Sequence, residues 1–106
     1  MSLLSFFSRP TMEQGLSRFR ETPGAVLLDV RTREEYAGGF IPGSRNLPLQ
    51  ELAGSSKLPA DRGTPLFVYC LSGGRSRQAA GLLRRMGYTE VVDLGGIHRY
   101  HGKVMK

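Results

Sequence analysis

The amino-acid sequence predicts one α/β domain over residues 1–106, with a central parallel sheet of about five strands and helices on both faces. Short, continuous apolar runs at 25–30, 66–69 and 91–94 are typical of strands that are buried on both faces. Segments with helical spacing or helix-capping residues separate these runs. The length of 106 residues fits one domain, because two separate cores would each be too small to bury enough apolar surface.

The first half of the chain supplies the outer elements of this arrangement. Thr11 and Gln14 form a capping-box pattern, which predicts a helix that ends before Pro23 and Gly24. After the first strand, the spacing and the position of Pro48 predict a short helix at 33–38, an extended segment at 43–47 and a second short helix at 48–52.

The second half contains the most informative segment. The strand at 66–69 runs directly into Cys70 and two glycines, and a helix is expected to begin near Arg75 and to end at Gly87. The third apolar run, at 91–94, leads into Gly95 and Gly96 and a last helical turn at 97–100. Parallel α/β sheets bind ligands beyond the carboxyl ends of their strands, and Cys70 is expected at such an end.

Composition narrows the classes of function. The formal net charge of +6 would attract anions, but the basic residues are scattered, so we expect no nucleic-acid partner. The sequence has no apolar run long enough to span a bilayer, and we expect no membrane partner. Residues 1–10 make a poor secretory signal and predict a cytoplasmic protein, with a periplasmic location as the alternative if Met1-Ser2-Leu3 replaces a removed leader.

The segment around Cys70 has the features of an anion-binding loop. A strand that turns sharply into a helix through glycines directs several backbone N–H groups into one small bowl at the positive end of the helix. Those donors and Arg75 would stabilise the Cys70 thiolate and make it a nucleophile. The alternative is an inert cysteine buried at the end of a core strand. Cys70 is the single cysteine, so no disulfide can form within the chain.

The loop from Cys70 to Ser76 resembles the active-site loop of rhodanese domains. Leu28-Asp29-Val30-Arg31 with the segment 41–48 is similar to an upstream signature of that family, and Leu94-Gly95-Gly96-Ile97 to a downstream one. The resemblance implies a rhodanese-like domain and a sulfurtransferase. In such an enzyme a small anionic donor such as thiosulfate loads the cysteine with sulfur, and cyanide or a thiol, which can be a protein thiol, unloads it.

The resemblance also implies roles for individual residues. Cys70 would carry a persulfide, and Arg75 would either bind the anionic donor or brace the loop through backbone carbonyls. The cradle around the outer sulfur would comprise Leu71, Ser72, Gly73, Gly74 and Ser76, with hydroxyl donors from the two serines. A buried ion-pair network near the site would comprise Asp29, Arg31 and Glu35. No cofactor is expected, and no metal, because His98 and His101 are read as solvated histidines.

Two other functions are compatible with parts of the pattern. A phosphatase or arsenate reductase would also use a cysteine and an arginine around an anion, but only four residues separate Cys70 from Arg75, one fewer than in those enzymes. A non-enzymatic rhodanese-type binding module would not need Cys70, which this chain retains. Phe40 and Tyr100 depart from the family pattern, and the short tail after Tyr100 is expected to change the rim of the pocket.

Overall fold

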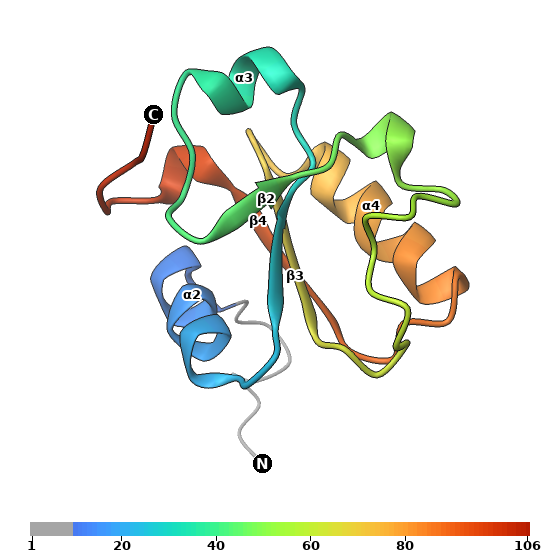
Figure 1. The fold of residues 1–106 in the computed structure, drawn as a ribbon. Coiled ribbons are helices and arrows are strands. Elements are labelled where there is room, and N and C mark those ends of the chain that lie inside the picture. The colour runs from blue at the N-terminus through green and yellow to red at the C-terminus, as the bar shows by residue number, and fades with distance from the viewer. Residues whose placement is uncertain (1–9) are drawn as a thin grey trace.

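The sheet contains four parallel strands, arranged in the order β2-β1-β3-β4 (Figure 1). They are β1 (Val26–Asp29), β2 (Ser44–Asn46), β3 (Leu66–Cys70) and β4 (Val91–Gly96) in a computed structural model that describes residues 10–106. The α/β class and the parallel sheet are confirmed. The described residues form four strands where about five were expected, in line with the four extended segments of the sequence.

Helices cover both faces of the sheet (Figure 1). The helix α2 (Met12–Glu21) and the 3-10 turn η2 (Ile97–Arg99) lie on one side, and α4 (Gly74–Arg85) lies on the other. The shorter elements α3 (Arg33–Ala37) and η1 (Leu49–Glu51) connect the strands. The capping box expected at Thr11 is present, since its hydroxyl accepts the Gln14 N–H and its own N–H binds the Gln14 side chain.

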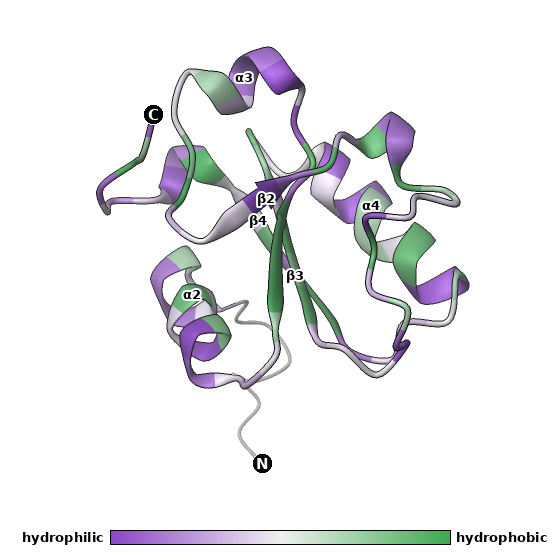
Figure 2. Cartoon of the chain, viewed as in Figure 1, coloured by the Kyte–Doolittle hydropathy of each residue, from purple (hydrophilic) through white to green (hydrophobic). Residues whose placement is uncertain are grey.

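The strand β3 is buried along its whole length and divides its side chains between two cores. Leu66, Val68 and Cys70 belong to the core under α4, whereas Phe67 and Tyr69 belong to the core under α2. Successive residues of a strand point to opposite faces, so this division follows from the register of the strand. In Figure 2, β1 and β3 are accordingly green along most of their length, whereas the edge strand β2 is hydrophilic.

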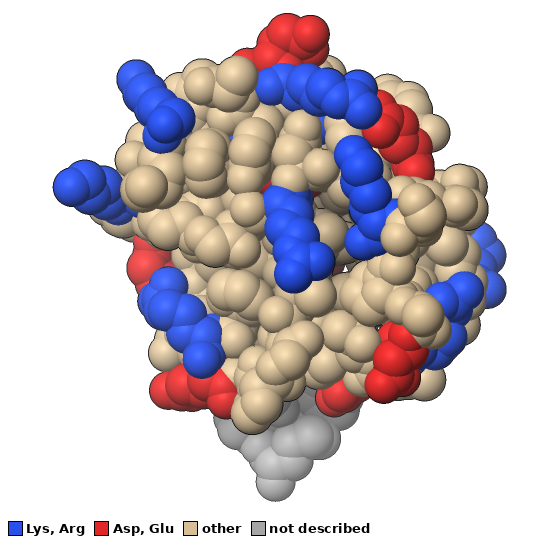
Figure 3. All heavy atoms as spheres, in the orientation of Figure 1, with Lys and Arg blue, Asp and Glu red and all other residues tan. Residues whose placement is uncertain are grey.

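The surface is charged but carries no continuous basic stripe on the face drawn in Figure 3. Lys and Arg side chains on that face are separated by uncharged surface and by acidic residues. Within residues 10–106, no helix combines the length and the apolar character that crossing a bilayer requires.

We expect Leu83→Ala to lower the free energy of unfolding by about 2–5 kcal/mol, because this fully buried side chain fills the core between α4 and the sheet. Gln78→Ala, on the exposed side of the same helix, is the matched control and should change it by less than about 0.5 kcal/mol. Urea denaturation measures both values. Equal effects of the two substitutions would contradict the packing described above.

Candidate active site

The register of β3 directs the Cys70 side chain toward α4. Cys70 is the last residue of the strand and only 1% exposed, and its side chain shares a face with Val68 and Leu66. The next element along the chain is α4, which begins at Gly74, slightly earlier than the sequence predicts. The thiol therefore faces the amino end of a helix of 12 residues, where backbone N–H groups have no partner within the helix.

Two backbone N–H groups donate to the sulfur of Cys70. The distances from Sγ are 3.0 Å to the nitrogen of Gly73 and 3.3 Å to the nitrogen of Ser76. The loop reaches this geometry because Gly73, the residue before the helix, has φ of +116°, a conformation that favours glycine. The expected anion cradle is thus built, in this structure, from two main-chain donors around the thiol.

The two serines of the loop differ in their surroundings. The Ser76 hydroxyl is buried and donates to the Gly73 carbonyl at 3.1 Å, so it fixes the loop. Ser72 is exposed, and Leu71 beside it is 45% exposed. The Ser76 hydroxyl thus joins the Gly73 carbonyl and, at 3.5 Å, the Gly95 carbonyl, and a donor role for either serine stays a prediction.

Arg75 forms a bidentate ion pair with Glu35. Its two terminal nitrogens lie 2.7 Å and 3.0 Å from the two carboxylate oxygens, and the side chains are 31% and 29% exposed. These hydrogen bonds lower the pKa of Glu35 to about 2 and raise the pKa of Arg75. The sequence left donor binding and carbonyl bracing open for Arg75. The observed contact is a third arrangement, which ties the start of α4 to α3.

Glu35 has a second role that keeps this ion pair in place. The N–H of Thr32 donates to Glu35 Oε1 at 2.9 Å, and the Thr32 hydroxyl accepts the N–H of Glu35 at 3.1 Å. This capping box fixes the carboxylate at the start of α3. A side chain already held by the backbone loses less conformational entropy when it binds Arg75.

The expected network of Asp29, Arg31 and Glu35 is divided into two parts. Asp29 is fully buried and accepts three hydrogen bonds of 2.7–3.0 Å from the Arg31 side chain. Arg31 Nη2 also donates to the Gly39 carbonyl at 2.8 Å. Glu35 is not buried and forms its hydrogen-bonded ion pair with Arg75, and its charge is one of several that raise the pKa of Arg31. The buried pair holds the carboxyl end of β1 against the segment that follows α3.

His98 contacts the cysteine loop, which the sequence analysis missed. Its Nδ1 donates to the Leu71 carbonyl at 2.9 Å, and its backbone N–H approaches the same oxygen at 3.4 Å. Gly96 permits this approach, because a Cβ at that position would overlap both the Leu71 oxygen and His98 Nδ1. The signal in the sequence was the Gly95-Gly96 pair, which marks a close approach of two backbones.

The tail after Tyr100 pairs with the segment after α3. Phe40 and Met105 exchange two backbone hydrogen bonds, of 2.9 Å and 2.8 Å, in an isolated antiparallel bridge. The Phe40 ring stacks on Tyr36 of α3, with centroids 4.2 Å apart. The rim near α3 is therefore covered by the tail itself, and Phe40 contributes an aromatic contact at its departure from the family pattern.

Comparisons with known proteins agree on one family. The model of the rhodanese-like domain matches residues 12–103. The thiosulfate sulfurtransferase GlpE of Pseudomonas putida is 34% identical over 93 residues, which cover 88% of this chain and 83% of that protein. YqhL of Bacillus subtilis is 40% identical over 82 residues, covering 76% of this chain but only 64% of that protein. A structure of a rhodanese with anions from Escherichia coli matches with a TM-score of 0.70 and 33% identity, covering 77% of this chain and 98% of that one.

Gly96→Ala should lower the free energy of unfolding by about 1–3 kcal/mol, because the new methyl group would overlap the Leu71 carbonyl and the His98 ring. Gly74→Ala is the matched control, since a Cβ there meets no atom within 4 Å. Urea denaturation of both variants tests the close approach of the two loops. A stable Gly96→Ala protein would mean that these backbones lie farther apart.

The ion pair of Glu35 should make stability depend on acid pH. Its lowered folded-state pKa means that the pair stabilises the fold fully above the ordinary carboxyl pKa of about 4.3 and loses this effect as pH falls toward 2. Glu35→Gln, which preserves the size of the side chain, should cost on the order of 1 kcal/mol at pH 7 and little near pH 2.

Denaturant midpoints measured at several pH values would show this difference. Glu34→Gln, on the exposed part of the same helix, is the control and should show no such dependence. A constant gap between wild type and Glu35→Gln from pH 7 to pH 2 would contradict the ion pair.

Proposed function

We propose that this chain, which belongs to the rhodanese-like domain family, moves sulfane sulfur from a small anionic donor such as thiosulfate to a nucleophilic acceptor through a persulfide on Cys70. The observation that carries the proposal is the pair of backbone N–H groups, from Gly73 and Ser76, directed at the Cys70 sulfur. Sulfurtransferase activity is supported at the level of the family by relatives such as the thiosulfate sulfurtransferase of Pseudomonas putida.

The proposed reaction consists of two displacements at sulfur. The Cys70 thiolate attacks the outer sulfur of thiosulfate, a new S–S bond forms, and sulfite leaves with the electron pair of the broken bond. A nucleophile such as cyanide or a thiolate then attacks the outer sulfur of the persulfide. The electron pair of that second S–S bond returns to Cys70, so the enzyme regenerates its thiolate without any cofactor.

Backbone N–H groups and the amino end of α4 surround the Cys70 sulfur. Hydrogen bonds from N–H groups to an anion are stronger than those to a neutral group, and the amino end of α4 adds a favourable dipole. The same two N–H groups would bind the thiolate that leaves when the acceptor attacks the outer sulfur. Leu71, Ser72 and Gly74 of the loop are exposed, whereas Cys70 itself is buried.

The geometry offers less to a phosphatase. A phosphate-binding loop needs donors around a whole tetrahedral oxyanion, whereas this loop has four residues between Cys70 and Arg75. The Arg75 guanidinium is also committed to two oxygens of Glu35. A domain that only binds a partner would not need a thiol with two N–H groups directed at its sulfur.

Thiosulfate should add one sulfur atom to the protein at Cys70, because the chain has no second thiol that could discharge the persulfide. Intact-mass and peptide mass spectrometry would locate the added sulfur, and subsequent cyanide should remove it. Cys70→Ser is the control and should stay unmodified. An unloaded wild-type protein, under conditions in which another rhodanese is loaded, would contradict the proposed mechanism.

A further inference from the structure

A pocket of about 580 Å³ lies between α4 and η1, on the side of the sheet opposite to α2 (Figure 1). Its apolar part consists of Leu49, Ala53 and Leu82, and the two leucines are half-buried and pack on the core under α4. No residue of the Cys70 loop lines this pocket, and none of its residues takes part in the site described above. The pocket is therefore a separate surface of the molecule.

Two arginines of α4 flank the pocket. The side chains of Arg77 and Arg85 are exposed and form neither a hydrogen bond nor an ion pair with any residue in 10–106. Eight residues of helix place them about 12 Å apart along its axis. No acid is among the described residues that line the pocket, and Glu51 of η1 is paired with Arg33 at 2.6 Å. Both guanidinium charges are therefore available to an anionic ligand.

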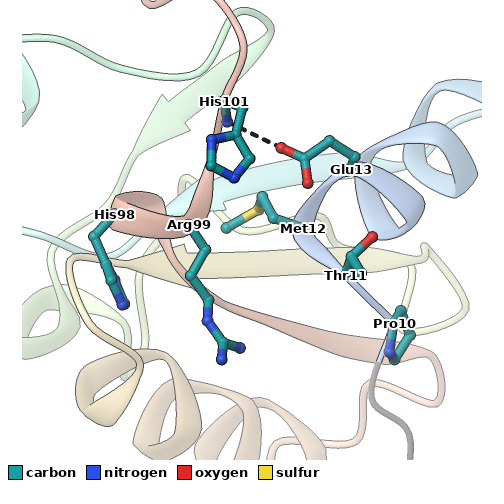
Figure 4. Close-up of a pocket in the computed structure, with 7 residues that line it drawn as sticks. All are labelled: Pro10, Thr11, Met12, Glu13, His98, Arg99 and His101. Atoms are coloured by element: carbon teal, nitrogen blue, oxygen red, sulfur yellow. Dashed lines mark hydrogen bonds between the residues drawn. The ribbon is translucent and has the colours of Figure 1, made fainter.

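The pocket beside α2 differs from this one in charge (Figure 4). Glu13 and Arg99 line it together, and Glu13 Oε2 accepts the backbone N–H of His101 at 2.9 Å. Opposite charges in that pocket offset each other, whereas the described lining of the pocket beside α4 carries two positive charges and no negative one. Anions are therefore attracted to the pocket beside α4 more strongly than to the pocket beside α2.

Gly81 lies between the two arginines, at a position where the fold does not require a glycine. It belongs to the interior of α4 and has no positive φ. Apart from the neighbouring helix backbone, a Cβ added to it would meet only Arg85 Nη1, at an ordinary contact distance of 3.5 Å. Alanine would fit there and is a better helix former than glycine. What glycine provides at this position is open space between Arg77 and Arg85.

An acidic peptide in an extended conformation matches this arrangement. Residues 1, 3 and 5 of an extended segment point to one side and span about 13 Å, at about 3.3 Å per residue. Carboxylates on residues 1 and 5 would reach the two arginines, which bind carboxylates through paired N–H donors. An aliphatic residue 3 would contact Leu49 and Leu82. Gln50 and Gln78 add side-chain amides that can bind a peptide backbone.

Nucleic acid fits the same pocket less well. A phosphate backbone makes no use of the apolar part of the pocket. None of the described residues that line it is aromatic, so a base has no ring to stack on. Two arginines about 12 Å apart are also fewer charges than the basic patch or stripe that is typical of nucleic-acid surfaces.

We propose that the pocket between α4 and η1 docks an acidic segment of a partner protein, in which two carboxylates flank an aliphatic residue. Arg77 and Arg85 bind the carboxylates, and Gly81 keeps the space between them open. The inference goes beyond the proposed sulfur transfer, because the pocket contains no residue of the Cys70 loop. Docking holds the partner on the protein and takes no part in any bond-breaking step.

A peptide titration followed by backbone amide chemical shifts tests this docking site on the folded protein. The probe is acetyl-Glu-Thr-Leu-Thr-Glu-amide, because threonine favours the extended conformation. We expect saturable shifts in α4 and η1. Arg77→Ala and Arg85→Ala should each weaken binding about threefold, which is typical of an exposed ion pair. Arg20→Ala removes the same charge from the exposed surface of α2 and should bind the peptide as wild type does.

Two further controls make the docking site falsifiable. A peptide with glutamine in place of both glutamates should give no saturable shift. Gly81→Ala should raise the urea midpoint, because alanine favours the helix, and should weaken peptide binding severalfold, because the methyl group occupies space beside Arg85. Equal binding of the glutamine peptide, equal weakening by Arg20→Ala, or tighter binding of single-stranded DNA at the same amides would overturn the proposal.

The docking site and the proposed sulfur transfer can fail separately. Cys70→Ser leaves the lining of the pocket unchanged and should bind the peptide as wild type does. A wild-type protein that binds the peptide but transfers no sulfur would overturn the proposed function alone. A wild-type protein that transfers sulfur but shows no saturable peptide shifts would overturn the docking site alone.

Discussion

The site depends on one constraint, which is that β3 must end with Cys70 on the α4 face and the chain must turn at once into α4. Strand alternation sets the first condition, and the left-handed conformation of Gly73 sets the second. A shift of β3 by one residue would place Cys70 under α2, away from the N–H groups of Gly73 and Ser76. The register of β3 therefore determines both how the strand packs and where the Cys70 side chain lies.

Charge pairs then secure the elements around this turn. The buried Asp29–Arg31 pair lies at the carboxyl end of β1, and the Glu35–Arg75 pair joins α3 to the start of α4. Breaking a buried pair leaves an uncompensated charge, which costs far more than breaking an exposed pair. The two pairs thus differ in function: the first is needed for the fold, and the second adjusts the position of the loop that follows Cys70.

Most of the architecture could be predicted from the sequence. The apolar runs, the Thr11 capping box and the glycines after Cys70 indicated the strands, helices and loop nearly in place, because these signals are local. Two contacts join residues that lie far apart in the chain. His98 and Leu71 are separated by 27 positions, and Arg75 and Glu35 by 40. Spacing along the chain carries no information about such contacts. The contacts of the Ser76 hydroxyl could not be predicted for a related reason, since only the folded loop brings the Gly73 and Gly95 carbonyls within its reach.

Recognition of sulfur by main-chain N–H groups limits what side-chain mutagenesis can reveal. Alanine at position 71, 72 or 74 would leave both donors to Cys70 in place, because every residue except proline keeps its amide hydrogen, whereas alanine at Gly73 would strain the left-handed turn. Replacing the peptide bond before Gly73 or Ser76 by an ester, through chemical ligation, would remove one donor while leaving the side chains unchanged. The side chains at positions 71, 72 and 74 can therefore change while the backbone path that directs both N–H groups at the Cys70 sulfur stays the same.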